Sequence, residues 1–141
     1  MERPKFDFYH WQQEYSCGII KLDEHREKLI GIYNMMIERY NERRCKDNIT
    51  DAFFKIAFGT ESYFFDLEIM LRQLNYPGFS AKKEAHQKVL NRIVQFKEDF
   101  SLQKQTVCID MLKFMSEWIQ NEILTFDSQI NTFLQTKGVS V

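Results

Sequence analysis

The sequence predicts an all-α fold, an antiparallel up-down-up-down four-helix bundle. Helix breakers are scarce, with 2 Pro and 5 Gly in 141 residues. Apolar residues recur at spacings of three and four along four long segments, which is typical of amphipathic helices. The connections between these segments are short, which favours antiparallel neighbours. We therefore expect a single domain over 1–141, with a non-helical N-terminal arm (1–20), the bundle (21–135) and a tail (136–141).

The first two helices are expected over 22–43 and 50–74. Asn48 or Thr50 can cap the second helix, and the NYPG turn at 75–78 ends it because proline cannot continue a helix. Helical spacing directs two stripes toward the core: Leu22, Arg26, Leu29, Tyr33, Met36 and Tyr40 in the first helix, and Phe53, Ile56, Thr60, Tyr63, Leu67, Met70 and Leu74 in the second.

The third and fourth helices are expected over 80–102, capped by Ser80, and over 106–134. Their core stripes are Lys82, His86, Val89, Ile93, Phe96 and Phe100 in the third helix, and Leu112, Met115, Ile119, Glu122 and Phe126 in the fourth. On the second helix, the cluster of phenylalanines at 53–65 cannot all face one direction, so an exposed aromatic patch would mark a dimer or partner surface.

Charge and cysteine usage exclude several classes of protein. A formal net charge of -1 gives no basic footprint for nucleic acid or an anionic membrane. The three cysteines show neither a disulfide framework nor metal-ligand spacing, which favours a reduced compartment. No segment approaches the roughly 20 apolar residues of a membrane span, and the N-terminus lacks a signal-peptide pattern. We expect a cytoplasmic protein.

Five polar or ionisable residues on the core stripes should converge in one layer. In an antiparallel bundle, the start of the first helix, the end of the second, the start of the third and the end of the fourth lie at one end. These portions carry Arg26, Tyr63, Lys82, His86 and Glu122, and Asp127 flanks the same layer. Since isolated buried charges cost several kcal/mol each, such residues must be paired, ligated or reached by water.

Four motifs extend over nearly the whole chain and resemble those of one family. They are WQQEYSCGIIKLDEHR at 11–26, YFFDLE at 63–68 followed by NYPGF at 75–79, KKEAH at 82–86, and WIQNEILTFD at 118–127. Together they resemble the motifs of the bacterial hemerythrins. This resemblance implies a four-helix bundle whose core holds two oxygen-binding irons, with five histidines and two bridging carboxylates as ligands.

The ligand positions of that family carry different residues in this chain, which the resemblance therefore identifies as a degenerate member. The family's histidines fall on Arg26, Tyr63, Lys82, His86 and Glu122, and its bridging carboxylates on Leu67 and Asp127. Only His86 and Asp127 keep the family's residue. Arginine never gives up its proton, and lysine would have to lose its charge before it could ligate. We expect no diiron centre, no metal site and no cofactor.

Two functional hypotheses remain open. In the first, Arg26, Tyr63, Lys82, His86, Glu122 and Asp127 form a core ion-pair network in place of the metals. The protein is then a non-enzymatic binding, interaction or signalling module, whose partner is an unknown protein or a second copy. In the alternative, it is a metal-dependent oxygen carrier or sensor with a rearranged or mononuclear site at His86, Glu122 and Asp127, for iron or another single transition metal. An oxidative enzyme finds no suitable base or nucleophile in the sequence.

Overall fold

A computed structural model of the chain describes residues 3–47, 49–103 and 106–138, except for the side chains of 124–129 and 131. Every regular element over these residues is helical, so the predicted all-α class is confirmed. The described residues contain no helix that is long and apolar enough to cross a membrane.

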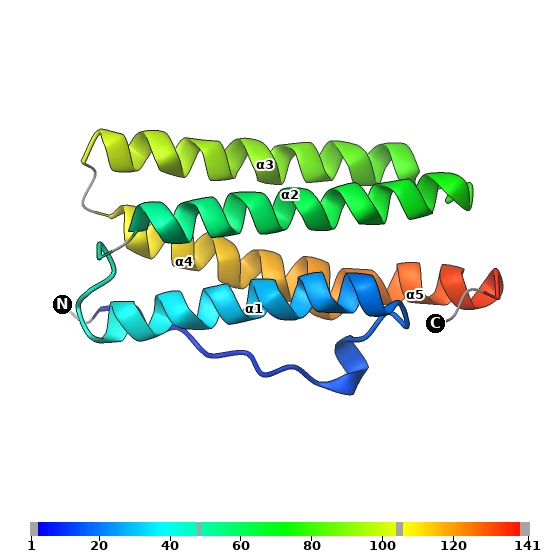
Figure 1. Ribbon diagram of the computed structural model, residues 1–141, viewed down its shortest axis with the longest axis horizontal. Coiled ribbons are helices and arrows are strands. Elements are labelled where there is room, and N and C mark those ends of the chain that lie inside the picture. The colour runs from blue at the N-terminus through cyan, green and yellow to red at the C-terminus, as the bar shows by residue number, and fades with distance from the viewer. Residues whose placement is uncertain (1–2, 48, 104–105, 139–141) are drawn as a thin grey trace.

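Four long helical segments lie side by side along the longest axis (Figure 1). The first three are α1 (Ile20–Asn41), α2 (Ile49–Gln73) and α3 (Phe79–Ser101), and the fourth begins as α4 (Val107–Trp118). The colour gradient in Figure 1 shows that the chain reverses direction from each segment to the next. Helix α1 packs against α2 and α4, and α3 packs against α2 and α4. The starts of α1 and α3 therefore lie at the same end.

The fourth segment differs from the single predicted helix over 106–134. After α4 the chain forms a π-helix, η2 (Ile119–Phe126), and then returns to α-helical geometry in α5 (Asp127–Thr136). A π-helix closes hydrogen bonds to the fifth residue instead of the fourth, which widens the turn and changes which way its carbonyls and side chains point. The change in geometry falls on the motif at 118–127.

The helix ends follow turn chemistry, but two predicted caps, Ser80 and Thr50, are wrong. Asn75, at a φ of 57°, takes the left-handed conformation after α2, and the N–H of Tyr76 donates to the carbonyl of Leu71 at 2.9 Å. This is a Schellman end. Ser80 lies inside α3, whose N-cap is Gly78 without a side-chain cap bond. Thr50 likewise lies inside α2, and Asn48 lies outside the described residues.

The N-terminal arm is tied to α1 by hydrogen bonds from its own backbone. It is non-helical from residue 3 to residue 19 except for a 3₁₀ turn, η1 (Gln13–Tyr15). Asn34 exchanges two bonds with the backbone of Tyr9, accepting from its N–H at 3.0 Å and donating to its carbonyl at 2.7 Å. The hydroxyl of Tyr40 donates to the carbonyl of Pro4 at 2.7 Å. Side chains of α1 thus bind the backbone of the arm through hydrogen bonds, in addition to packing in the core.

Candidate functional site

Arg26 lies in the core of the bundle. Its side chain is 1% exposed, because its position on α1 continues the apolar stripe through Leu22 and Leu29. Nη2 donates to the carbonyl of Ile123 at 2.5 Å, and Nη1 lies 3.6 Å from Oδ1 of Asp23. The guanidinium thus joins α1 to η2.

Lys82 brings a second buried cation from the first turn of α3. Its side chain is 1% exposed, and Nζ donates to Oε2 of Glu122 in η2. Glu122 and Ile123 are neighbours in sequence, so the two buried cations, Arg26 and Lys82, end on adjacent residues of the π-helix. Each buried cation thus has an oxygen acceptor: the backbone carbonyl of Ile123 for Arg26 and the carboxylate of Glu122 for Lys82.

His86 occupies the same layer, one helical turn after Lys82. Its ring stacks on Phe64 with centroids 3.7 Å apart, and Nδ1 lies 2.7 Å from Oε2 of Glu68. Burial, aided by the positive charge of Lys82, lowers the pKa of His86 to about 3. The imidazole is therefore neutral and donates its Nδ1 proton to Glu68. Among the described residues Nε2 has no hydrogen-bond partner.

Tyr63 and Leu67 complete the contribution of α2, and both are buried. The ring of Tyr63 meets Trp118 edge-on at 6.5 Å between centroids. Leu67 offers only carbon at its position, so nothing there can bridge two metal ions. The side chain of Asp127 lies outside the described residues, and its predicted place in the layer stays a prediction.

Two partners in this layer were not part of the predicted ion-pair network. Asp23, which faces Arg26, also accepts from Ser16 Oγ at 2.5 Å and from the N–H of Cys17 at 3.0 Å. The contact between Asp23 and Arg26 could have been predicted, because residues three apart on one helix are neighbours. Glu68, the partner of His86, lies next to Leu67 and therefore outside the core stripe of α2.

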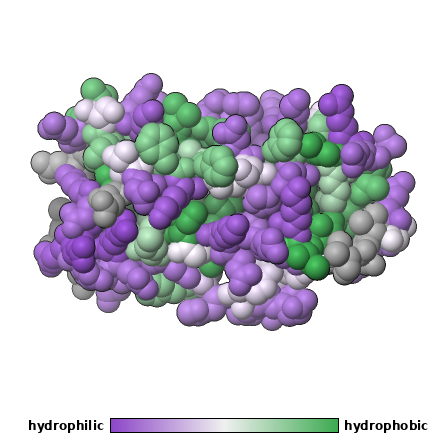
Figure 2. Space-filling model, in the orientation of Figure 1, coloured by the Kyte–Doolittle hydropathy of each residue, from purple (hydrophilic) through white to green (hydrophobic). Residues whose placement is uncertain are grey.

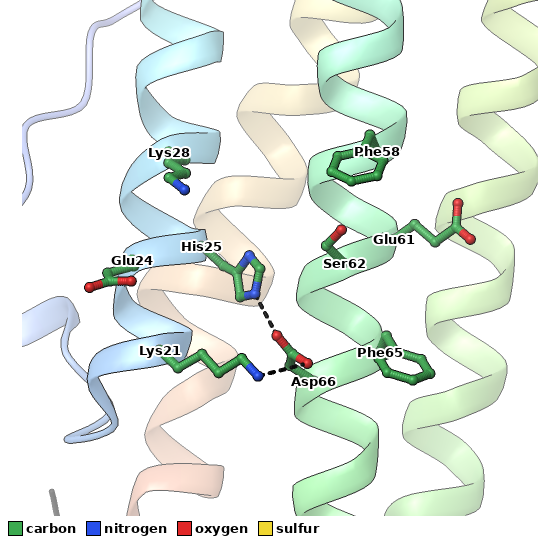
Figure 3. A pocket seen from close by; sticks show the side chains of 9 residues that line it. All are labelled: Lys21, Glu24, His25, Lys28, Phe58, Glu61, Ser62, Phe65 and Asp66. Carbon is green, nitrogen blue, oxygen red and sulfur yellow. Dashed lines mark hydrogen bonds and ion pairs between the residues drawn. The ribbon is translucent and has the colours of Figure 1, made fainter.

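His25 lies outside the layer, on the surface between α1 and α2. Its Nε2 is 2.7 Å from Oδ2 of Asp66, and Nζ of Lys21 is 3.4 Å from the other oxygen (Figure 3). Burial acts to raise the pKa of Asp66, but the hydrogen bonds from His25 and Lys21 outweigh it and lower that pKa. These residues line an open hollow together with Phe58 and Phe65.

Comparisons with known proteins agree with the helical architecture. No protein-family model matches the chain. It is 25% identical over 123 residues to a bacteriohemerythrin of Clostridium acetobutylicum, covering 84% of this chain and 95% of that protein. This similarity supports a hemerythrin-like family.

The donors around this layer do not fit a two-iron centre of the kind that the sequence resemblance implies. A guanidinium and an ammonium lie at two of the positions that the resemblance assigns to metal ligands, and each has an oxygen partner. Leu67 lies at a third such position. Within the described part of the chain, no three His, Cys, Asp or Glu side chains come together as a metal-ion site. The layer is built from cations and hydrogen bonds.

Proposed function

We propose that this chain is a hemerythrin-like, up-down-up-down four-helix bundle that holds buried cations instead of metal ions and acts as a non-enzymatic interaction module. The burial of Arg26 and Lys82 against η2 is the observation that carries the first half of the proposal. Each places a positive charge where a metal ligand would have to offer a lone pair. Their charges take over the electrostatic role of the metals toward the carboxylates of the layer.

Two features of the layer oppose the alternative, an oxygen carrier or sensor with a mononuclear site. Such a site would draw on His86 and Glu122, but Glu122 already accepts from Lys82, and this pair would have to break. The pair of His86 with Glu68 uses Nδ1 and could stay in place while Nε2 bound a metal. A divalent cation beside Lys82 and Arg26 would, however, meet like charge in a low-dielectric interior.

Metal titration tests this half of the proposal. A metal ion that binds only the folded state raises the free energy of unfolding by RT ln(1 + [M]/Kd), and with it the melting temperature. We expect the melting temperature of the apo-purified chain to be unchanged by Fe²⁺, Mn²⁺ or Zn²⁺ at equimolar and tenfold-excess concentration. A rise that grows with the metal concentration and is lost in His86→Gln would support the alternative function instead.

The interaction half of the proposal is carried by an exposed apolar face of α2. Figure 2 shows hydrophobic side chains, among hydrophilic ones, over the region where α2 and α3 lie in Figure 1. Phe58 is 76% exposed and Phe65 is 64% exposed. At 100° per residue, the apolar members of this face span about 60° of the helix circumference. They are Phe54, Phe58, Phe65 and Ile69, which we call the α2 face.

The α2 face is symmetric about a point between Glu61 and Ser62. Around that centre an antiparallel copy of α2 would set Phe58 against Phe65 of the second copy, and Phe54 against Ile69. A two-fold dimer requires such a self-complementary surface, because every contact between a residue of one copy and a residue of the other occurs a second time with the copies exchanged.

Charged residues at the two ends of the α2 face have the same symmetry. Asp51 lies exposed at one end and Arg72 exposed at the other, and the antiparallel arrangement sets each against the opposite charge on the second copy. A parallel pairing would set Asp51 against Asp51 and Arg72 against Arg72, and the repulsion between like charges disfavours it. We therefore propose a second copy of this chain as the partner.

Self-association is tested by sedimentation velocity over a concentration series. The chain should dimerise reversibly, and Phe58→Glu with Phe65→Glu should shift it to monomer. Leu102→Glu is the matched control, since Leu102 is 71% exposed after the end of α3 and outside the face. Arg72→Asp should weaken the dimer, and adding Asp51→Arg should restore it. A monomer at all concentrations, or a dimer insensitive to the phenylalanine variants, would overturn this assignment.

A further inference from the structure

Two of the three cysteines come together at the end of the bundle opposite the buried layer. Cys45 lies in the connection from α1 to α2, and Cys108 lies in the first turn of α4. Both segments are at the left in Figure 1. The two thiol side chains line one open hollow of about 330 Å³. The fold has thus paired two residues that are far apart in sequence.

The hollow around these thiols is cationic. Arg3, Arg43, Arg44 and Lys46 line it, together with Asp47. Arg44 is paired with Glu42 and Asp47, so the net positive charge comes from Arg3, Arg43 and Lys46. Positive charge near a thiol favours the thiolate, which is the reactive form. Cys108 gains further from its place in the first turn of α4, where the helix dipole is positive.

The positions of the two thiols assign them different roles. Cys108 lies in the first turn of α4, and its pKa is lowered by the neighbouring thiol of Cys45 and by the charge of Lys46, against the opposing effect of burial. Cys45 lies in the connection from α1 to α2, and the neighbouring thiol and burial raise its pKa. We therefore assign Cys108 as the attacking thiol and Cys45 as its partner.

We propose that Cys45 and Cys108 form a dithiol site that reacts with hydrogen peroxide and closes to an intrachain disulfide. Cys108 is only 6% exposed, which favours a small neutral oxidant over a bulky disulfide such as oxidised glutathione. Cys45 is half-buried beside it and is positioned as the resolving thiol.

The reaction balances in two steps. The thiolate of Cys108 attacks one oxygen of the peroxide, so that an S–O bond forms, the O–O bond breaks, and hydroxide leaves and takes up a proton as water. The sulfur of Cys45 then attacks the sulfur of Cys108, forming the S–S bond and expelling hydroxide, which takes the Cys45 proton as the second water. Two thiols and one hydrogen peroxide give one disulfide and two waters.

Cys17 provides an internal comparison within the same chain. It is buried at 5% exposure, and burial raises its pKa to about 11. Asp23 accepts from its backbone N–H, which places a negative charge beside the thiol. Cys17 should therefore stay reduced under conditions that oxidise the other two cysteines.

The reduced 141-residue chain is treated with one equivalent of hydrogen peroxide, quenched with catalase, alkylated under denaturing conditions and mapped by mass spectrometry. We expect one Cys45–Cys108 cross-linked peptide pair, two fewer hydrogens per chain, and alkylated Cys17. The comparison with Cys17 needs no variant and so does not depend on a variant's folding. Oxidation of Cys17 at the same rate, or alkylation of Cys108 in full, would overturn the proposal.

Two serine variants separate the roles of the thiols. In Cys45→Ser, oxidation should stop at the sulfenic acid of Cys108, which dimedone traps. In Cys108→Ser, Cys45 should stay a free thiol after the same treatment. Dimedone labelling of Cys45 in Cys108→Ser at the wild-type rate of peroxide consumption would contradict the assignment of Cys108 as the attacking thiol.

Discussion

Arg26 donates from Nη2 to the backbone carbonyl of Ile123 at 2.5 Å, so a cation of α1 ends on a π-helical segment of the fourth helix. Lys82 reaches the preceding residue, Glu122, from α3. Three long helical segments are therefore joined in one layer by two buried cations. The departure from α-helical geometry coincides with the place where these cations need oxygen acceptors.

Replacing Arg26 with histidine should destabilise the fold and should not restore iron. Histidine is too short to reach the carbonyl of Ile123 and removes the permanent charge facing Asp23. We expect the free energy of unfolding to fall by about 3–5 kcal/mol, as for the loss of one partner from a buried charged pair. Urea denaturation measures it. Arg43→His is the control, because Arg43 is exposed and histidine tolerates its positive φ; equal losses in the two variants would argue against the buried role.

Removing the ammonium of Lys82 should leave Glu122 without its cation. Lys82→Met keeps the length of the side chain and should cost about 3–5 kcal/mol of unfolding free energy. The exposed neighbour gives a matched control, since Lys83→Met should change stability by less than about 0.5 kcal/mol. A double-mutant cycle with Glu122→Gln measures the coupling directly. A coupling energy near zero would mean that the pair contributes nothing.

His86 should make the fold sensitive to acid. Burial, with the charge of Lys82, lowers its pKa to about 3 from 6.5, so the unfolded chain binds the proton more readily. The contribution of His86 is complete above pH 6.5 and is lost as the pH falls toward 3, at up to about 1.4 kcal/mol per pH unit. Burial raises the pKa of Glu68, against the charge of Lys83, which acts in the opposite direction. Denaturant unfolding from pH 7 to 4 should show a shallower decline in His86→Gln than in the wild type, and parallel curves would contradict this account.

The arm should detach when its anchor on α1 is removed. Asn34→Ala deletes both hydrogen bonds to the backbone of Tyr9 and should cost about 1–3 kcal/mol, because a backbone donor and a backbone acceptor lose their partners. Amide hydrogen exchange should become faster over the arm, while the cores of α2 and α3 stay protected. Gln87→Ala, on the exposed face of α3, is a neutral comparison. Unchanged exchange at Tyr9 would mean that other contacts hold the arm.

The positions of the helices could be predicted from the sequence, whereas the contacts within the buried layer could be predicted only in part. Periodicity located four long segments, and it placed Arg26, Tyr63, Lys82 and His86 on stripes that the structure buries. It could not locate η2, because a π-helical turn depends on partners from other helices and leaves no mark in hydrophobic spacing. Glu68 was not included in the predicted network for a related reason. It flanks the stripe of α2, and only the rotation of α2 against α3 brings it to His86.

The most direct measurement is the metal content of the protein purified from iron-replete cells, determined by elemental analysis against protein concentration. We expect a colourless protein with far less than one iron, manganese or zinc per chain, because the cations Arg26 and Lys82 already occupy the layer. Two irons per chain, retained through gel filtration, would contradict it.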